Sequence, residues 1–114
     1  MEASKVINFA LLGCGRIAQR YATLLAKEGI DGGRLVSVCD NQIDRCQKLG
    51  LEAGVPFYSS LDAMMHSHGA EIDVVCILTE SGNHARDTLA VAEYRKHVVV
   101  EKPMALTLDD ADAM

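Results

Sequence analysis

Two kinds of segment alternate along this chain. Short apolar runs rich in Val, Ile, Leu and Cys lack a polar face, whereas the longer segments between them repeat apolar residues with helical spacing. Runs that are apolar on both sides are typical of strands in a parallel sheet covered by helices on both faces. The pattern therefore predicts an α/β fold built on a doubly wound parallel sheet.

The same pattern gives the boundaries of the elements. Strands are expected over residues 6–12, 34–40, 56–58, 72–78 and 97–100. Helices are expected over residues 17–27, 43–52, 60–65 and 83–95. The short third strand and the helix after it should lie at an edge of the sheet.

The last residues have the features of a helix start. Thr107 is a suitable N-cap, and the carboxylates after it favour the positive end of a helix: Asp109, Asp110 and Asp112. The chain stops about two turns later, which is short for a helix. We therefore expect residues 1–114 to be one domain, truncated in its last helix, of a longer two-domain protein.

Composition narrows the choice of partners. With 49% hydrophobic and 24% charged residues, the chain has an ordinary globular composition. Its net charge of −5 argues against nucleic acid and anionic membranes as partners. The apolar runs are shorter than the roughly 20 residues of a membrane helix, and the N-terminus has no secretory signal pattern. We expect a cytoplasmic protein.

The four cysteines do not form a metal or disulfide pattern. Cys14, Cys39, Cys46 and Cys76 include no C-x-x-C pair, and most lie in or beside apolar runs. They are expected to be buried free thiols in a reducing compartment, with no metal site.

A glycine motif follows the first apolar run, with the sequence Gly13-Cys14-Gly15-Arg16-Ile17-Ala18. In G-x-G-x-x-A, the glycines let a strand turn sharply into a helix and let the backbone approach a pyrophosphate at the helix N-terminus. The motif predicts a dinucleotide site formed by Gly13, Gly15, Arg16, Ile17 and Ala18. Taken alone it is a weak signal, because it also occurs in other nucleotide-binding folds.

Asp40 ends the second predicted strand, roughly 20 residues after the glycine motif, where a carboxylate can bind both hydroxyls of the adenosine ribose. This position favours NAD, because the carboxylate would repel the 2′-phosphate of NADP. Arg45, one helical turn further on, would partly compensate. Alternatively, Asp40 only caps the helix that follows it.

Residues 79–84 connect the fourth predicted strand to its helix, beside the crevice where the strand order reverses and ligands bind. Thr79 and His84 are candidates for contact with the cofactor, His84 as a neutral imidazole. The alternative for His84 is a histidine that merely begins a helix.

Lys102 lies in the run Glu101-Lys102-Pro103, directly after the last predicted strand. Oxidation of an alcohol requires loss of a proton as hydride leaves, and a lysine beside a cationic nicotinamide has the chemistry to accept it. We predict that Lys102 is the catalytic residue. By spacing alone, a solvated lysine in a turn is the more common case.

From Val6 to about Met104 the chain resembles the N-terminal domain of the Gfo/Idh/MocA family, named for glucose-fructose oxidoreductase and inositol dehydrogenase. The resemblance is carried by the glycine motif, Asp40, residues 79–84 and Lys96-His97-Val98-Val99-Val100-Glu101-Lys102-Pro103, similar to the family pattern G-K-H-V-x-x-E-K-P. It implies a Rossmann domain that binds a nicotinamide cofactor through Gly13, Gly15, Ala18 and Asp40. It also implies a role for Glu101 and Lys102 beside the nicotinamide and substrate, and a second α+β domain for the substrate.

Two positions depart from the family pattern. Glu80 stands where the family usually has Pro, which leaves the path of that loop open. Arg95 stands where the family has Gly, and a left-handed backbone there would cost about 1 kcal/mol.

Three functions compete at this stage. The leading one is an NAD-dependent dehydrogenase that oxidises a secondary alcohol of a sugar or nucleotide sugar, NADP being the less favoured cofactor. The loop sequences look closest to the branch that makes nucleotide sugars for surface lipopolysaccharide. Residues 1–114 alone would be inactive, and the full-length protein is expected to be a homo-oligomer. The second is a non-catalytic NAD(P)-binding regulator. The third, an S-adenosylmethionine methyltransferase, leaves Glu101-Lys102-Pro103 unexplained.

Overall fold

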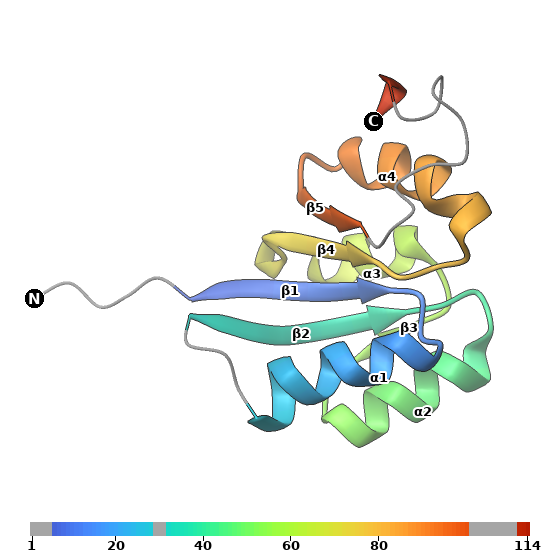
Figure 1. Ribbon diagram of the computed structural model, residues 1–114. Helices are drawn as coiled ribbons and strands as arrows, with labels where there is room; N and C mark the ends of the chain where they lie inside the picture. The colour runs from blue at the N-terminus through green and yellow to red at the C-terminus, as the bar shows by residue number, and fades with distance from the viewer. Residues whose placement is uncertain (1–5, 29–31, 101–111) are drawn as a thin grey trace, which may run out of the picture.

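A parallel sheet forms the centre of the molecule. The computed structural model describes residues 6–28, 32–100 and 112–114. Five parallel strands lie in the order β3-β2-β1-β4-β5 (Figure 1). Their bounds are β1 Ile7–Leu12, β2 Gly33–Cys39, β3 Phe57–Tyr58, β4 Val74–Ile77 and β5 His97–Val100. The predicted doubly wound sheet is confirmed, with the short β3 at one edge and the strand order reversing between β1 and β4.

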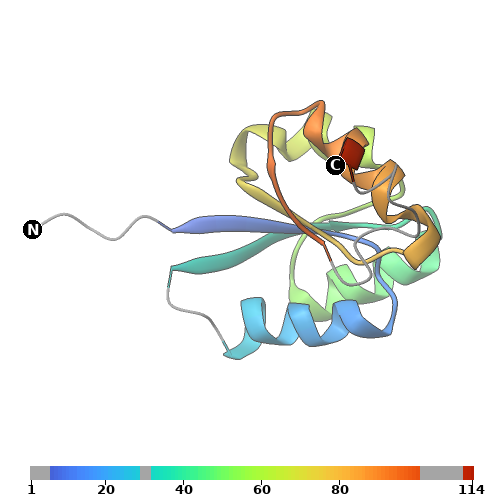
Figure 2. The same cartoon turned by 45° about the horizontal axis from the view of Figure 1, so that its top comes forward.

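Helices cover both faces of this sheet. The α-helices are α1 Arg16–Ala22, α2 Ile43–Ala53, α3 Leu61–His68 and α4 His84–Ala92. A π-helical segment, η1 Thr23–Glu28, continues α1, and the short 3-10 turns are η2 Gly69–Glu71 and η3 Ser81–Asn83. Helices α1 and α2 pack on one face, and α3 and α4 on the other (Figures 1 and 2).

Neighbouring residues of a strand pack into two separate hydrophobic cores, because side chains alternate between the two faces of a sheet. In β1, Leu11 packs toward α1 and α2 with Ala18 and Leu49. The preceding residue, Ala10, packs on the other face with Met64 of α3 and Val91 of α4. Burial on both faces explains why the strands read as apolar runs without alternation.

Two predicted helices end differently in the structure. The helix expected over residues 17–27 becomes α1 followed by η1, and at the junction the Thr23 hydroxyl donates to the Gln19 carbonyl at 2.9 Å. A hydroxyl that shares a carbonyl of the preceding turn competes with the regular helical bond. The helix expected over residues 83–95 ends at Ala92, and a tight turn leads to Arg95.

Arg95 occupies the left-handed conformation, with φ of 60°. The family pattern has glycine at this position, which is one of the two departures noted in the sequence. The backbone N–H of Arg95 donates to the Ala92 carbonyl at 2.9 Å, so the turn that joins α4 to β5 closes despite the side chain. Arginine in this conformation costs about 1 kcal/mol relative to glycine.

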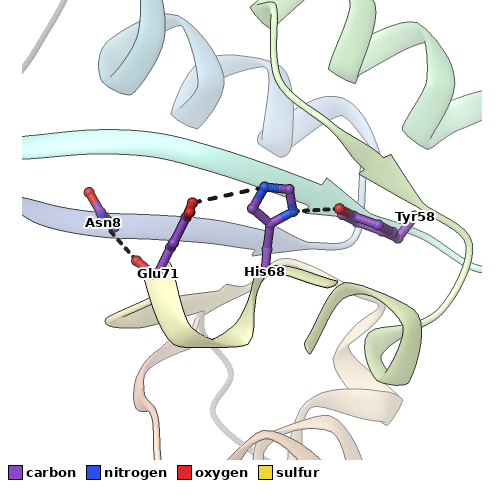
Figure 3. Close-up of polar contacts among 4 residues, drawn as sticks. All are labelled: Asn8, Tyr58, His68 and Glu71. Carbon is purple, nitrogen blue, oxygen red and sulfur yellow. Dashed lines mark hydrogen bonds and ion pairs between the residues drawn. The ribbon is translucent and has the colours of Figure 1, made fainter. Parts of the chain in front are cut away.

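Polar contacts close the amino end of the sheet around the start of β1. Asp73 Oδ2 accepts the backbone N–H of Asn8 at 2.8 Å, and the Asn8 side-chain amide donates to the Glu71 carbonyl at 2.7 Å. His68 lies between Glu71 and Tyr58, with its Nδ1 in a hydrogen bond to the Tyr58 hydroxyl (Figure 3). These contacts tie α3 and η2 to β1 and β3.

The structure also bears on the membrane and the cysteines. Within the described ranges, no helix is long and apolar enough to cross a membrane. Cys14, Cys39, Cys46 and Cys76 are all buried and free, as predicted. The helix start predicted at Thr107 lies outside the described residues, so truncation of the last helix stays a prediction.

Candidate functional site

A cleft of about 610 Å³ opens at the carboxyl ends of the strands. Its walls come from the loops after β1, β2, β3 and β4 and from the first turns of α4. This is the point where the strand order reverses, the usual ligand site of a doubly wound sheet. Six of the predicted cofactor residues line it: Gly13, Gly15, Arg16, Ile17, Asp40 and Thr79.

Gly13 makes the sharp turn out of β1. Its φ is 103°, a backbone conformation that side chains disfavour. A Cβ atom at this position would lie 2.7 Å from the backbone carbon of Leu78 and 2.8 Å from the backbone nitrogen of Thr79. The first glycine is therefore required by the protein itself, because the loops after β1 and β4 touch there.

Gly15 has the opposite surroundings. It is the N-cap of α1, no side chain caps that end of the helix, and a Cβ atom built on Gly15 would meet no protein atom within 4 Å. The space beside it opens into the cleft. The free N–H groups at a helix start attract an anion, so this open space suits a pyrophosphate.

Ala18, the last residue of the motif, is fully buried between α1 and the sheet. It does not belong to the cleft wall, whereas the preceding Arg16 and Ile17 do. A small side chain at this position lets the helix approach the strands closely. The structure thus places Ala18 in the core beneath the glycine loop and outside the cleft wall.

Asp40 binds the backbone of two loops and also lines the cleft, whereas the N-cap of α2 is Gln42 and has no side-chain cap. Its Oδ2 accepts the backbone N–H of Cys14 and its Oδ1 accepts that of Gln42, both at 2.8 Å. The carboxylate therefore joins the glycine loop to the start of α2. It still lines the cleft, and a carboxylate has about four lone-pair sites, so acceptor capacity remains for ribose hydroxyls.

Cys14 forms an uncharged part of the loop. Burial raises the pKa of its thiol to about 12, with a further contribution from the charge of Asp40. Its Sγ donates to the Cys39 carbonyl at 3.4 Å. A neutral thiol adds no negative charge beside the place proposed for phosphates.

The loop after β4 is held from below by two side chains of α4. The Thr79 hydroxyl donates to Asp87 Oδ2 at 2.6 Å, and the Thr79 carbonyl accepts from His84 Nε2 at 2.8 Å. His84 is only 2% exposed and does not line the cleft, whereas Thr79 does. The structure therefore places His84 as a support of the loop, and the predicted contact of His84 with a cofactor is not seen in its geometry.

Several cleft residues escaped the sequence analysis. They follow β3 or lie in α4: Ser59, Ser60, Leu61, Asp62, Arg86, Asp87 and Ala90. The signal available for them was position, since the carboxyl ends of all parallel strands meet at one edge. Glu80 lines the same wall, and its carbonyl accepts the backbone N–H of Asn83 at 2.8 Å, so the loop closes without the family's proline.

Glu101 and Lys102 lie outside the described residues. Strand β5 ends at Val100, which pairs with Ile77 immediately before the cleft residues Leu78 and Thr79. Among the residues that are described, no group of three or more His, Cys, Asp or Glu side chains could hold a metal ion.

Comparison with known proteins finds dehydrogenases of similar sequence. The chain is 33% identical to D-apiose dehydrogenase of Paraburkholderia graminis over 92% of its own length and 27% of that protein. It is 31% identical to scyllo-inositol 2-dehydrogenase (NAD(+)) of Bacillus subtilis, over 94% of this chain and 31% of that one. The chain thus spans about a third of the length of the curated relatives it matches.

Solved structures share the fold over nearly the whole chain. The WlbA dehydrogenase of Bordetella pertussis, in complex with NADH and UDP-GlcNAcA, matches with a TM-score of 0.87 and 33% identity over 99% of this chain and 33% of that one. Scyllo-inositol dehydrogenase of Lactobacillus casei, with bound NAD(H) and scyllo-inositol, matches with a TM-score of 0.82 and 28% identity over 95% of this chain and 31% of that one.

A family model decides the assignment. Residues 7–114 match the model of the oxidoreductase family with an NAD-binding Rossmann fold, and the cofactor expected from Asp40 agrees with the NAD(H) of the matching structures. This chain therefore belongs to the Gfo/Idh/MocA oxidoreductase family, as its NAD-binding Rossmann domain.

Proposed function

We propose that this chain is the cofactor domain of a dehydrogenase that transfers hydride between a secondary alcohol of a sugar or nucleotide sugar and NAD. The single observation that carries the proposal is the contrast within the glycine loop. Protein atoms fill the space beside Gly13, whereas the space beside Gly15 is open and faces the cleft. That open space is what the backbone approach of a pyrophosphate requires.

Successive groups of cleft residues suit successive parts of a dinucleotide. The backbone at Gly15, Arg16 and Ile17 would hold the pyrophosphate, and Asp40 would accept the ribose hydroxyls. Thr79, held by Asp87 and His84, would border the nicotinamide half. When bound, NAD supplies the hydride acceptor.

The chain's own chemical contribution would come from Lys102. Oxidation of an alcohol releases a proton, and the amine of Lys102 would accept it, with Glu101 acting at the same site. In the longer protein, a second α+β domain would hold the substrate. Sugar-like substrates are supported by the relatives, among them WlbA with UDP-GlcNAcA and scyllo-inositol dehydrogenase with its inositol. A place in lipopolysaccharide synthesis would follow from a nucleotide-sugar substrate.

Kinetics of the full-length protein test the role of Lys102. Lys102→Ala should lower turnover by about 10²–10⁴-fold, the usual contribution of general acid–base catalysis, with NAD affinity nearly unchanged. Lys102→Arg is the matched control: it should rescue little, because a guanidinium stays protonated. Turnover of Lys102→Ala within about threefold of the parent would remove the lysine from the mechanism. That result would favour the non-catalytic NAD(P)-binding regulator.

We further propose a cytoplasmic, homo-oligomeric protein. Four buried free thiols suit a reducing compartment, where such cysteines persist. Val99 of the edge strand β5 is 41% exposed, so its apolar side chain is available for contact with another subunit. Sedimentation of the full-length protein would measure the oligomeric state, and a monomer at all concentrations would contradict the second part.

A further inference from the structure

The loop after β4 lies on the other side of the glycine loop from Asp40. The strand order β2-β1-β4 puts Asp40, the glycine loop and Thr79 in succession along the carboxyl edge of the sheet. Thr79 adjoins the glycine loop directly, because a Cβ atom on Gly13 would lie 2.8 Å from its backbone nitrogen. A dinucleotide that crosses the switch point with its adenosine ribose at Asp40 therefore brings its nicotinamide ribose to Thr79.

The Thr79 hydroxyl has a single proton, and Asp87 accepts it. The Thr79 Oγ1 donates to Asp87 Oδ2 at 2.6 Å, a short distance typical of a hydroxyl bound to a carboxylate. A hydroxyl has one donor and two lone pairs. Since the proton is already committed to Asp87, any further hydrogen bond of this oxygen is one that it accepts. Thr79 lines the cleft, so a ligand there meets an acceptor.

The surroundings of Asp87 suit this role as an acceptor. It lies in the first turn of α4, where the positive end of the helix favours a carboxylate. Its side chain is only 13% exposed, so little water competes for the Thr79 proton. Arg86 Nε lies 3.3 Å from the other oxygen, Oδ1, but the exposed arginine contributes little. His84 holds the Thr79 carbonyl from the same helix, so α4 fixes both oxygens of Thr79.

We propose that Asp87 is a positioning residue that makes the Thr79 hydroxyl a hydrogen-bond acceptor for the nicotinamide ribose of NAD. The inference rests on the proposed function and adds a residue that sets the register of the dinucleotide along the cleft. A ribose hydroxyl can donate to Thr79, whereas the oxygens of the pyrophosphate can only accept. Two acceptors that face each other repel, so Thr79 favours the ribose beside it and disfavours a dinucleotide shifted by one unit.

Calorimetric titrations of the full-length protein with ADP, ADP-ribose and NAD test this inference. ADP lacks the second ribose, whereas ADP-ribose and NAD contain it. Asp87→Ala should weaken NAD and ADP-ribose by about fivefold to tenfold and ADP by less than about twofold, because the affected hydrogen bond needs the second ribose. Thr79→Val removes the hydroxyl from a side chain of similar shape, and it should give the same pattern.

Two further variants separate positioning from structural support. Asp87→Asn keeps an oxygen that can accept the Thr79 proton, so NAD affinity should stay within about threefold of the parent. In the double variant of Asp87→Ala and Thr79→Val, the loss should equal that of Thr79→Val alone, because Asp87 acts through this hydroxyl. Glu93→Ala is the matched control: Glu93 follows α4 and does not line the cleft, so all three affinities should stay unchanged.

Retained ADP binding by Asp87→Ala shows that this variant is folded, and Thr79→Val carries the same test if it is not. Equal losses of all three ligands, additive losses in the double variant, or unchanged NAD affinity in Asp87→Ala would overturn the role of Asp87 and leave the proposed function intact. A loss for NAD without a loss for ADP-ribose would assign the bond to the carboxamide and overturn the ribose contact. A parent protein that binds neither NAD nor ADP-ribose would overturn the proposed function as well.

Discussion

The polar groups at the two ends of the sheet differ in whether they are bound to other protein groups. At the amino end, Asp73 accepts the backbone N–H of Asn8. The Asn8 side chain, Glu71 and His68 continue a network in which protein groups bind one another (Figure 3). At the carboxyl end, the N–H groups at the start of α1 have no side-chain cap and face an open cleft. The first arrangement stabilises the fold, and the second leaves binding capacity for a ligand.

Two aspartates show this difference at single residues. Asp73 and Asp40 each accept a backbone N–H at 2.8 Å beside one end of β1, from Asn8 and Cys14 respectively. Only Asp40 also lines the cleft. The same carboxylate chemistry therefore supports the fold alone at one end and both fold and site at the other, because the loops after parallel strands leave a crevice there.

The largest effect should come from Gly13→Ala. A methyl group would collide with the backbone at Leu78 and Thr79, and alanine disfavours a φ of 103°. We expect the free energy of unfolding to fall by about 3 kcal/mol or more. Urea denaturation measures it. A loss below about 1 kcal/mol would mean that the loops after β1 and β4 are not in contact.

Gly15→Val should affect binding in place of folding. The side chain would enter the open space proposed for the pyrophosphate, so NAD affinity should fall by at least about a hundredfold, or about 2.7 kcal/mol. The free energy of unfolding should change far less than in Gly13→Ala. Calorimetry gives the first quantity and urea denaturation the second. A variant that binds NAD as tightly as the parent would refute the assignment of the loop.

Asp40→Asn and Asp73→Asn separate the two ends of the sheet directly. Both oxygens of Asp40 accept a backbone N–H, so an asparagine there loses one of the two bonds, whereas an asparagine at Asp73 can keep the bond to Asn8 through its amide oxygen. Asp40→Asn should therefore lower the free energy of unfolding by about 1–2 kcal/mol, and Asp73→Asn by less. Only Asp40→Asn should weaken NAD binding, and it should weaken NADP less than NAD because a charge facing the 2′-phosphate is lost. Equal effects of the two variants on NAD affinity would remove Asp40 from the site.

The pKa of Cys14 gives a prediction about pH. Burial raises it from 9.0 to about 12, so the unfolded chain loses this proton at lower pH than the folded chain. The corresponding stabilisation is complete below pH 9.0 and is lost as the pH rises toward 12. At pH 8, alkylation of Cys14 followed by mass spectrometry should be slow without urea and fast in urea. Rapid alkylation of the folded protein would show that the thiol is not protected.

Arg95→Gly should have the smallest effect, and it should stabilise. The left-handed backbone at φ 60° suits glycine, and the gain should be about 1 kcal/mol. NAD affinity should stay unchanged, because Arg95 lies in the turn before β5 and does not line the cleft. Thermal denaturation measures the gain. A destabilised variant would mean that the Arg95 side chain contributes contacts that exceed its backbone cost.

Much of the fold and the position of the cleft could be predicted from the sequence. The apolar runs predicted five strands and a parallel sheet, and the glycine motif and Asp40 marked the cleft correctly. Helix ends were less predictable: α4 stops at Ala92, and the turn after it places Arg95 in a left-handed conformation. Such ends depend on where the chain must return to the sheet, which local propensity does not contain.

The sequence by itself determined the fold class, the cofactor class and the family, because these depend on periodicity and on a local loop whose glycines have a steric reason. Only the tertiary structure decided which motif residues line the cleft. It assigned Gly13 to contact with the loop after β4, Ala18 to the core and His84 to support of Thr79, and it left Gly15 facing open space. These assignments depend on distances between segments that are remote in sequence, and such distances are set only by the folded structure.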